Sequence, residues 1–207
     1  AIIAMWSGPR NISTALLRSW GNRADTAVID EPFYAHYLNH TGYDHPVAEK
    51  IIASYSTDWR EIVEQVTGDI PNNKPIFYQK HMTHHMLDHI DKSWMTQLIN
   101  WILSFEKVIP NPELHQLGIK QQVDIFKYVC EATGTIPPVI SARDVLMNPR
   151  KTLTKLCEVI GVPFDDAMLQ WEAGKRDTDG VWAEHWYASV EKSTVFMPYE
   201  EDDTPLP

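Results

Sequence analysis

The first twenty residues constrain the fold more strongly than any other part of the chain. Residues 2–6 form an unbroken apolar run, which is typical of a strand buried on both faces of a parallel sheet. A short segment rich in turn formers follows, and residues 12–20 then carry apolar side chains at helical spacing, with Gly21 at the end. The sequence therefore predicts a strand, a loop and a helix. The loop lies at the helix N-terminus, where the helix dipole and free N–H groups favour an anion.

The side chains of this loop suit an anionic ligand. The cation of Arg10 and the hydroxyls of Ser13 and Thr14 converge on the predicted helix N-terminus. A Walker-type loop has a second glycine and a lysine, and this loop has neither, which argues against hydrolysis of a nucleoside triphosphate. An ordinary strand-to-helix turn with Ser or Thr at the cap is the alternative interpretation. The candidate binding residues are Gly8, Arg10, Asn11, Ile12, Ser13 and Thr14.

Length and patterning favour one α/β domain. A chain of 207 residues that is 43% hydrophobic is long enough for one sizeable core. Strand and helix patterns alternate along it, which predicts a three-layer, doubly wound, mostly parallel sheet with a P-loop-like start. We expect a single domain over residues 1–197 and an acidic, poorly ordered tail over residues 198–207.

Charge and cysteine content exclude several classes of protein. The net charge of -10 at pH 7 argues against a nucleic-acid-binding surface. No apolar run approaches the ~18 residues of a membrane span, and the N-terminal run lacks the flanks of a signal peptide. Cys130 and Cys157 have neither a disulfide nor a metal-ligand spacing. We therefore expect a cytoplasmic protein that binds no metal ion.

One candidate for acid–base chemistry follows the second predicted strand, residues 26–29. Asp30 and Glu31 come directly after it, and ligands bind outside the carboxyl ends of strands in open α/β sheets. Glu31 is therefore a candidate catalytic residue. A structural interpretation is equally open, because an acid followed by Pro32 is also typical of the start of a helix.

A second candidate follows the third predicted strand, residues 75–79, which ends at the same edge of the sheet. Lys80 and His81 come next, and we expect a base and a cation to arrive there together. Histidine suits proton abstraction near neutral pH, and an ammonium group stabilises charge that develops on oxygen. His81, His85 and His89 are spaced four residues apart, but we discount a metal site because no H-E-x-x-H motif accompanies them.

Two polar segments are predicted to be loops near the site. Residues 36–46 are polar, aromatic and rich in turn formers, and we expect a loop that lines a substrate opening. Residues 174–186 show no strand or helix period and contain Lys175 and Arg176. They are either a surface loop or a lid that folds over a ligand.

These residues resemble a known family, the sulfotransferases that use 3′-phosphoadenosine 5′-phosphosulfate (PAPS). The phosphosulfate loop of that family reads K/R-S-G-T/S-T, and residues 10–14 are similar, with Ile12 in place of the glycine. The third strand of the family ends in K-T-H-L-P with the histidine as base, which places His81 on that histidine. In several bacterial members the glutamate of an E-P pair after the second strand supplies the base instead. Glu31 and Pro32 resemble that pair. Two bases therefore compete.

The C-terminal half extends the resemblance. Residues 148–170 are similar to the family's D-P-x-x-T-L-x-x-L-x-x-F-L-G-L-P helix, and residues 180–186 to its G-D-W-x-x-H-F lid. Cations just before that lid bind the 3′-phosphate of the donor, which implies this role for Lys175 and Arg176.

The resemblance has one departure at the fourth strand. In the family this strand runs into R-D-P and a serine eight residues after the arginine, and both contact the 3′-phosphate. Ser104 can match the serine, but the arginine segment is absent. Either residues are missing between Ile102 and Leu103, or a contact with the donor has been lost.

The resemblance implies transfer of a sulfuryl group from PAPS to a hydroxyl or amine of a small acceptor. His81 or Glu31 would be the base, and Lys80 with Arg10 would stabilise the bridging oxygen. Two alternatives stay open: a P-loop kinase or nucleotide hydrolase, and a non-catalytic nucleotide-binding module of the same fold. The aromatic residues between Phe33 and Tyr43 suggest an apolar or aromatic acceptor. No nucleic acid or membrane partner is expected, and a homodimer stays open.

Overall fold

A parallel sheet of five strands forms the centre of the computed structural model, which describes residues 1–9, 11–104 and 117–200. The strands are β1 (Ile2–Ser7), β2 (Thr26–Asp30), β3 (Ile76–Met82), β4 (Ile99–Ser104) and β5 (Val139–Ser141). Their order is β2-β3-β1-β4-β5, and all the described pairings are parallel. The chain goes to one side of β1 for β2 and β3 and to the other side for β4 and β5. The carboxyl end of β1 therefore lies where the strand order reverses, which is where ligands bind in such sheets.

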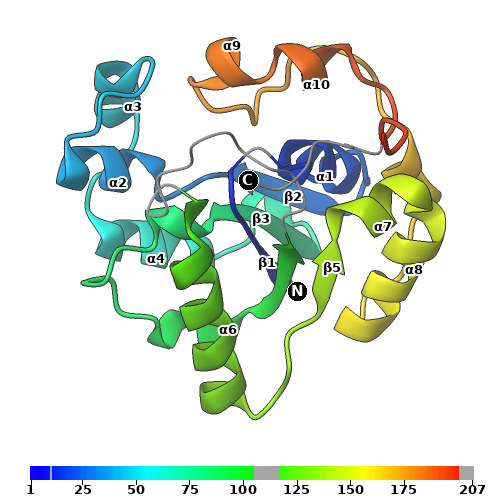
Figure 1. The fold of residues 1–207 in the computed structure, drawn as a ribbon, viewed down its shortest axis with the longest axis horizontal. Coiled ribbons are helices and arrows are strands. Elements are labelled where there is room, and N and C mark those ends of the chain that lie inside the picture. The colour runs from blue at the N-terminus through cyan, green and yellow to red at the C-terminus, as the bar shows by residue number, and fades with distance from the viewer. Residues whose placement is uncertain (10, 105–116, 201–207) are drawn as a thin grey trace.

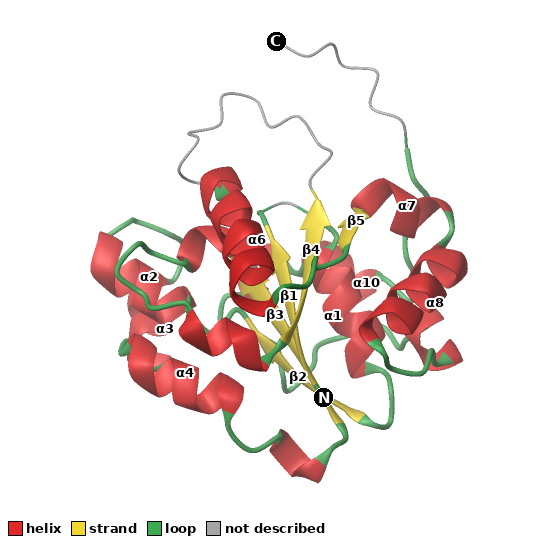
Figure 2. Ribbon diagram, turned by 90° about the horizontal axis from the view of Figure 1, so that it is seen from below, coloured by secondary structure: helices red, strands yellow, loops and turns green. Residues whose placement is uncertain are grey.

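Helices cover both faces of the sheet and complete three layers (Figures 1 and 2). One face packs against α1 (Ser13–Gly21), α7 (Ala142–Met147) and α8 (Pro149–Ile160), and the other against α4 (Trp59–Thr67) and α6 (Ile119–Thr133). The predicted doubly wound α/β fold is confirmed. The remaining described helices are α2 (Tyr34–Thr41), α3 (Ala48–Ser54), α9 (Ala183–Trp186), α10 (Ala188–Lys192) and the 3-10 turns η1 (Pro71–Asn73), η2 (Thr83–His85), η3 (Ser93–Gln97) and η4 (Asp166–Leu169).

Alternate residues of β1 pack into two separate cores. Ile3 and Met5 join the core beneath α1 and α8, whereas Ala4 and Trp6 join the core beneath α4 and α6. All four side chains are fully buried. This two-sided burial is the reason why the sequence of the strand is continuously apolar rather than alternating.

Helix α8 begins and ends at the residues that the sequence indicates. The side chain of Asn148 accepts a hydrogen bond of 3.1 Å from the N–H of Lys151, and Pro149 occupies the first turn. Gly161 ends the helix in the left-handed conformation, with φ 75°. Its apolar side, which includes Leu153 and Leu156, is buried against the sheet.

The loop predicted over residues 36–46 is wrong for most of its length. Residues 34–41 form α2, and Gly42 ends it with φ 69°. Tyr37 and Leu38 are buried on one side of this helix, which packs against α3. Burial of that apolar side outweighs the local preference of the polar residues for turns. The predicted loop over residues 174–186 likewise contains a short helix, α9.

Strand β4 runs without a break through the position where missing residues were suspected. Ile102 and Leu103 are consecutive in the strand and pair with Trp6 and Ser7 of β1. The strand itself therefore needs no inserted residues. Residues 105–116, which follow it, lie outside the described residues, as do Arg10 and most of the predicted tail. Within the described part of the chain, no helix combines the length and apolar character needed to cross a membrane.

Candidate active site

The loop between β1 and α1 lies at the carboxyl edge of the sheet. The side-chain oxygen of Asn11 accepts a hydrogen bond of 2.8 Å from the N–H of Ile12. The amide nitrogen of Asn11 donates to the backbone carbonyl of Ser104 at 3.3 Å, which ties the loop to the end of β4. Helix α1 then begins at Ser13 with no acidic residue in its first turn. This N-terminus is therefore electrostatically suited to an anion.

Gly8 lies where this loop passes close to another part of the backbone. A Cβ atom added to it would lie 2.9 Å from the carbonyl oxygen of Leu117. A larger residue would displace one of the two segments. Arg10, the predicted cation of the loop, lies outside the described residues.

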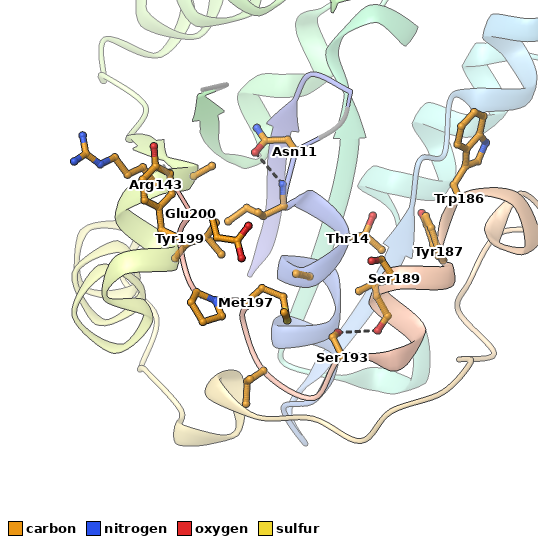
Figure 3. A pocket seen from close by; sticks show the side chains of 17 residues that line it. Asn11, Thr14, Arg143, Trp186, Tyr187, Ser189, Ser193, Met197, Tyr199 and Glu200 are labelled. Carbon is orange, nitrogen blue, oxygen red and sulfur yellow. Dashed lines mark hydrogen bonds between the residues drawn. The ribbon is translucent and has the colours of Figure 1, made fainter. Parts of the chain in front are cut away.

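A cavity of about 570 Å³ opens beside the loop (Figure 3). Its walls come from the first turn of α1, from α7, and from residues 186–200. Thr14, Tyr187 and Ser189 all line the cavity and are labelled in Figure 3. The sequence did not point to Arg143, which also lines it. Arg143 lies two residues beyond the end of β5, so the strand-end criterion that selected Glu31 would have found it.

A buried polar cluster lies at the ends of β2 and β3. The ammonium group of Lys80 donates three hydrogen bonds, to Asp30 (2.9 Å), Glu31 (2.7 Å) and the hydroxyl of Tyr187 (2.9 Å). The hydroxyl of Tyr187 in turn donates to the other oxygen of Asp30 and accepts from the indole N–H of Trp182 at 3.1 Å. The side chains of Lys80 and Asp30 are 1% exposed, and that of Glu31 is 12% exposed. Glu31 is therefore the member of this ion-paired cluster most open to a ligand.

The charged groups of this cluster shift one another's pKa values. Burial raises the pKa of Glu31, and the carboxylate of Asp30 adds to this, while the ammonium of Lys80 opposes both; the net shift is upward. Burial alone would lower the pKa of Lys80, but the two carboxylates outweigh it and hold that pKa well above its usual value. Lys80 therefore stays charged. A carboxylate whose pKa is raised toward neutrality is a better general base than an ordinary one.

The backbone of Glu31 is strained. Its φ of 42° lies in the left-handed region, which few residues other than glycine adopt. Two hydrogen bonds hold it there: its N–H donates to the carbonyl of Lys80 at 2.9 Å, and its carbonyl accepts from the N–H of Tyr34 at 3.0 Å. Such strain, held in place by neighbouring structure, is found preferentially at functional sites.

Lys80 and His81 point to opposite faces of the sheet, so the expected juxtaposition of their side chains is wrong. Strand β3 continues to Met82, and successive side chains of a strand alternate between faces. The ring of His81 stacks on Trp6, with centroids 4.5 Å apart, in the core beneath α4 and α6. Its Nε2 donates to the side-chain oxygen of Gln79 at 3.0 Å. The cavity and Glu31 lie on the other face.

Buried histidines make the folded protein sensitive to acid. Burial lowers the pKa of His81 and of His84 to about 3, whereas a histidine in the unfolded chain has a pKa of about 6.5. Below pH 6.5 the unfolded chain therefore binds protons that the folded chain does not, and the free energy of unfolding falls. We expect His81→Gln to reduce this loss between pH 6.5 and pH 5 by roughly 2 kcal/mol in urea unfolding.

The control for this measurement is His185→Gln. The side chain of His185 is 45% exposed on α9, so it keeps contact with water in the folded protein. This variant should lose stability with acid as the original chain does. The same loss in His81→Gln as in the original chain would contradict the assignment.

The family of the chain follows from a comparison of its whole length. Residues 1–207 match the sulfotransferase domain family. The chain belongs to this sulfotransferase family. The resemblance drawn from the loop, the strand ends and the C-terminal half is therefore confirmed at the level of the family.

Two solved structures share the fold of this sulfotransferase domain. The sulfotransferase domain from the curacin biosynthetic pathway superposes with a TM-score of 0.50 at 14% identity, covering 96% of this chain and 84% of that one. The sulfotransferase domain from the olefin synthase of Synechococcus PCC 7002 gives a TM-score of 0.51 at 14% identity, covering 94% and 90%. At this identity the likeness shows the fold alone.

Two curated relatives come from Arabidopsis thaliana. Branched-chain-amino-acid aminotransferase-like protein 1 is 37% identical over 204 residues, and protein 2 of the same name is 35% identical over 204 residues. Each alignment covers 94% of this chain and 36% of the relative. The sulfotransferase chain thus spans about a third of the length of these relatives.

The two predicted cations of the lid segment do not line the cavity of this sulfotransferase. The guanidinium group of Arg176 donates to backbone carbonyls of its own loop, including those of Gly174 (3.4 Å) and Lys175 (3.2 Å). The loop is fixed to α1 by a buried ion pair between Arg18 and Asp179, one of whose hydrogen bonds measures 2.8 Å. Binding of a 3′-phosphate by Lys175 and Arg176 therefore stays a prediction.

The histidines considered for a metal site are separated in the structure. His81 and His85 are buried, whereas His89 contacts His36, with 2.9 Å between the two Nε2 atoms. Within the ranges that the structure describes, no group of three or more His, Cys, Asp or Glu residues is arranged to hold a metal ion.

Proposed function

We propose that this chain transfers a sulfuryl group from PAPS to a hydroxyl or amine of a small acceptor, with Glu31 as the general base. The observation that carries the proposal is the position of the Glu31–Lys80 pair. It lies on the same face of the sheet as the cavity and is joined to the cavity wall through Tyr187. Family membership supports the reaction class, and this geometry supports the choice of base.

The loop at the end of β1 and the N-terminus of α1 would hold the 5′-phosphosulfate. Backbone N–H groups and the hydroxyls of Ser13 and Thr14 are the donors there, and Arg10 is assigned to this group by the resemblance. The cavity beside the loop would take the nucleoside, because its wall combines aromatic side chains such as Tyr199 with the cation of Arg143. Cavities of this size suit small-molecule ligands.

In the proposed reaction, Glu31 removes the proton of the acceptor hydroxyl as its oxygen attacks sulfur. The bond from sulfur to the bridging oxygen breaks, and 3′-phosphoadenosine 5′-phosphate leaves. All three N–H groups of Lys80 are occupied by protein partners, so one must be released to stabilise that oxygen. Protonation of Glu31 removes its negative charge and weakens its bond with Lys80. Proton transfer to the base thereby frees the cation for the leaving group.

The burial of the aromatic residues near α2 bears on the choice of acceptor. Tyr34 and Tyr37 are 5% and 2% exposed in the core around α2, and Phe33 is 2% exposed in the core beneath α4 and α6, so these three rings are buried and form no open surface. The earlier expectation of an apolar or aromatic acceptor depended on this segment. We therefore propose only a small acceptor that carries a hydroxyl or an amine.

Isothermal titration with 3′-phosphoadenosine 5′-phosphate tests the donor site. We expect binding to a single class of site, and Thr14→Val should weaken it about tenfold by removing a hydroxyl from the first turn of α1. Thr67→Val, on α4 and outside the cavity, should bind as the original chain does. Tighter binding of ATP with magnesium would instead support a kinase or hydrolase. Nucleotide binding without transfer would support a non-catalytic module.

A further inference from the structure

Tyr187 joins two parts of the molecule that are far apart in the sequence. Its backbone lies between α9 and α10, where its N–H donates to Ala183 at 2.9 Å and its carbonyl accepts from Glu191 at 2.8 Å. Its hydroxyl reaches the buried cluster at the ends of β2 and β3, where it accepts from Lys80. Tyr187 is 4% exposed, and it also lines the cavity (Figure 3).

The segment around Tyr187 is fixed by further contacts. Trp182 is 2% exposed and donates its indole N–H to the Tyr187 hydroxyl. Gly180 permits this position of the indole, because an added Cβ would lie 2.2 Å from the ring. The N–H of Val181 donates to the hydroxyl of Tyr55 at 3.2 Å. Residues 180–192, which we call the clamp segment, contain α9 and α10 (Figure 1). Hydrogen bonds at the hydroxyl groups of Tyr187 and Tyr55 and an exposed ion pair between Lys50 and Glu184 join this segment to the rest of the domain.

Only one of these two hydroxyls is connected to the ionised cluster. The Tyr187 hydroxyl uses its proton on Asp30 and accepts from Lys80, so it stabilises both charges. If it were withdrawn, Asp30 would lose a donor, and the ammonium of Lys80 would be drawn toward that carboxylate. Glu31 would then lose part of its interaction with the ammonium group, which opposes the rise in its pKa. The position of the clamp segment therefore bears on the charge state of Glu31.

We propose that Tyr187 is a positioning residue that holds Lys80 against Glu31. Glu31 is then ready to accept a proton only while the clamp segment packs beside the cavity. This inference rests on the proposed role of Glu31. Because Tyr187 also lines the cavity, a nucleotide bound there contacts the residue that sets the base. Donor binding and the readiness of the base are thereby linked through Tyr187.

The test is an NMR titration of Glu31 with ¹³C-labelled glutamate, in which Glu31→Gln identifies the signal. Tyr187→Phe should raise the midpoint of the Glu31 titration by about one pH unit, because the hydroxyl that balances Lys80 between its partners is lost. The matched control is Tyr55→Phe, which removes the other hydroxyl that holds the clamp segment. The bonds of the Tyr187 hydroxyl to Lys80, Asp30 and Trp182 stay in place in this variant, so the midpoint should be unchanged.

A second readout is turnover of PAPS with 2-naphthol as probe acceptor. Tyr187→Phe should lower kcat about ten- to hundredfold, with the acid limb of the pH profile moved to higher pH. An unchanged titration midpoint in Tyr187→Phe overturns the proposal, even if kcat falls. If Tyr187→Phe does not fold, Trp182→Phe replaces it and should shift the midpoint in the same direction. The titration needs no turnover, so failure of the proposed reaction is seen separately, as absence of transfer by the original chain.

Discussion

Glu31→Gln should lower kcat for transfer from PAPS by about a thousandfold, the range expected when a general base is removed. Glutamine keeps the size of the side chain and an oxygen that accepts from Lys80, but it cannot take a proton from the acceptor. The fold and the affinity for 3′-phosphoadenosine 5′-phosphate should therefore be retained. The measurement is steady-state turnover at pH 7 together with nucleotide titration.

Two further variants make this result decisive. Glu158→Gln removes a carboxylate from an exposed ion pair with Lys155 on α8, and it should turn over like the original chain. His81→Gln removes the competing base, and we expect it to retain most of its turnover because His81 lies in the opposite core. Full turnover in Glu31→Gln with loss in His81→Gln would reverse the assignment of the base.

The parts of the fold that could be predicted from the sequence are those in which burial leaves a local pattern. The continuous apolar run of residues 2–6 indicates a strand covered on both faces, and β1 is buried in that way. Asn148, Pro149 and Gly161 mark the two ends of α8 through local hydrogen bonds and backbone angles. Helix α2 was missed because its polar residues suggest turns, and only its tertiary packing makes it helical.

The candidate site was harder to predict because its contacts are not local. The strand-end criterion selected Glu31 and Lys80 separately, and the structure brings them within 2.7 Å of each other, while their role in catalysis stays a prediction. The bond from Lys80 to Tyr187 joins residues 107 positions apart, and no pattern around Tyr187 indicates it. The sequence around Arg176 shows a cation in a polar loop, but it does not indicate that the guanidinium group donates to backbone carbonyls of that loop. Composition shows which groups are present, but packing decides where they point.

Lys80→Met should cost both turnover and stability, in a manner that depends on pH. The variant leaves Asp30 and Glu31 as neighbouring buried carboxylates without their cation, which destabilises by about 3–5 kcal/mol when both are ionised. The ammonium of Lys80 opposes the rise in the pKa of Glu31, so without it that pKa rises further. Glu31 then stays protonated to higher pH, and the acid limb of kcat moves upward.

The pH dependence of the loss in stability identifies its cause. Protonation relieves the repulsion between the two carboxylates, so urea unfolding should show a larger loss for Lys80→Met at pH 8 than at pH 5. The double variant Asp30→Asn with Lys80→Met removes one of the opposed charges and should recover part of the loss at pH 8. Equal losses at both pH values would mean that Lys80 stabilises the protein by packing alone. That outcome would remove the electrostatic basis for treating Lys80 and Glu31 as a catalytic pair.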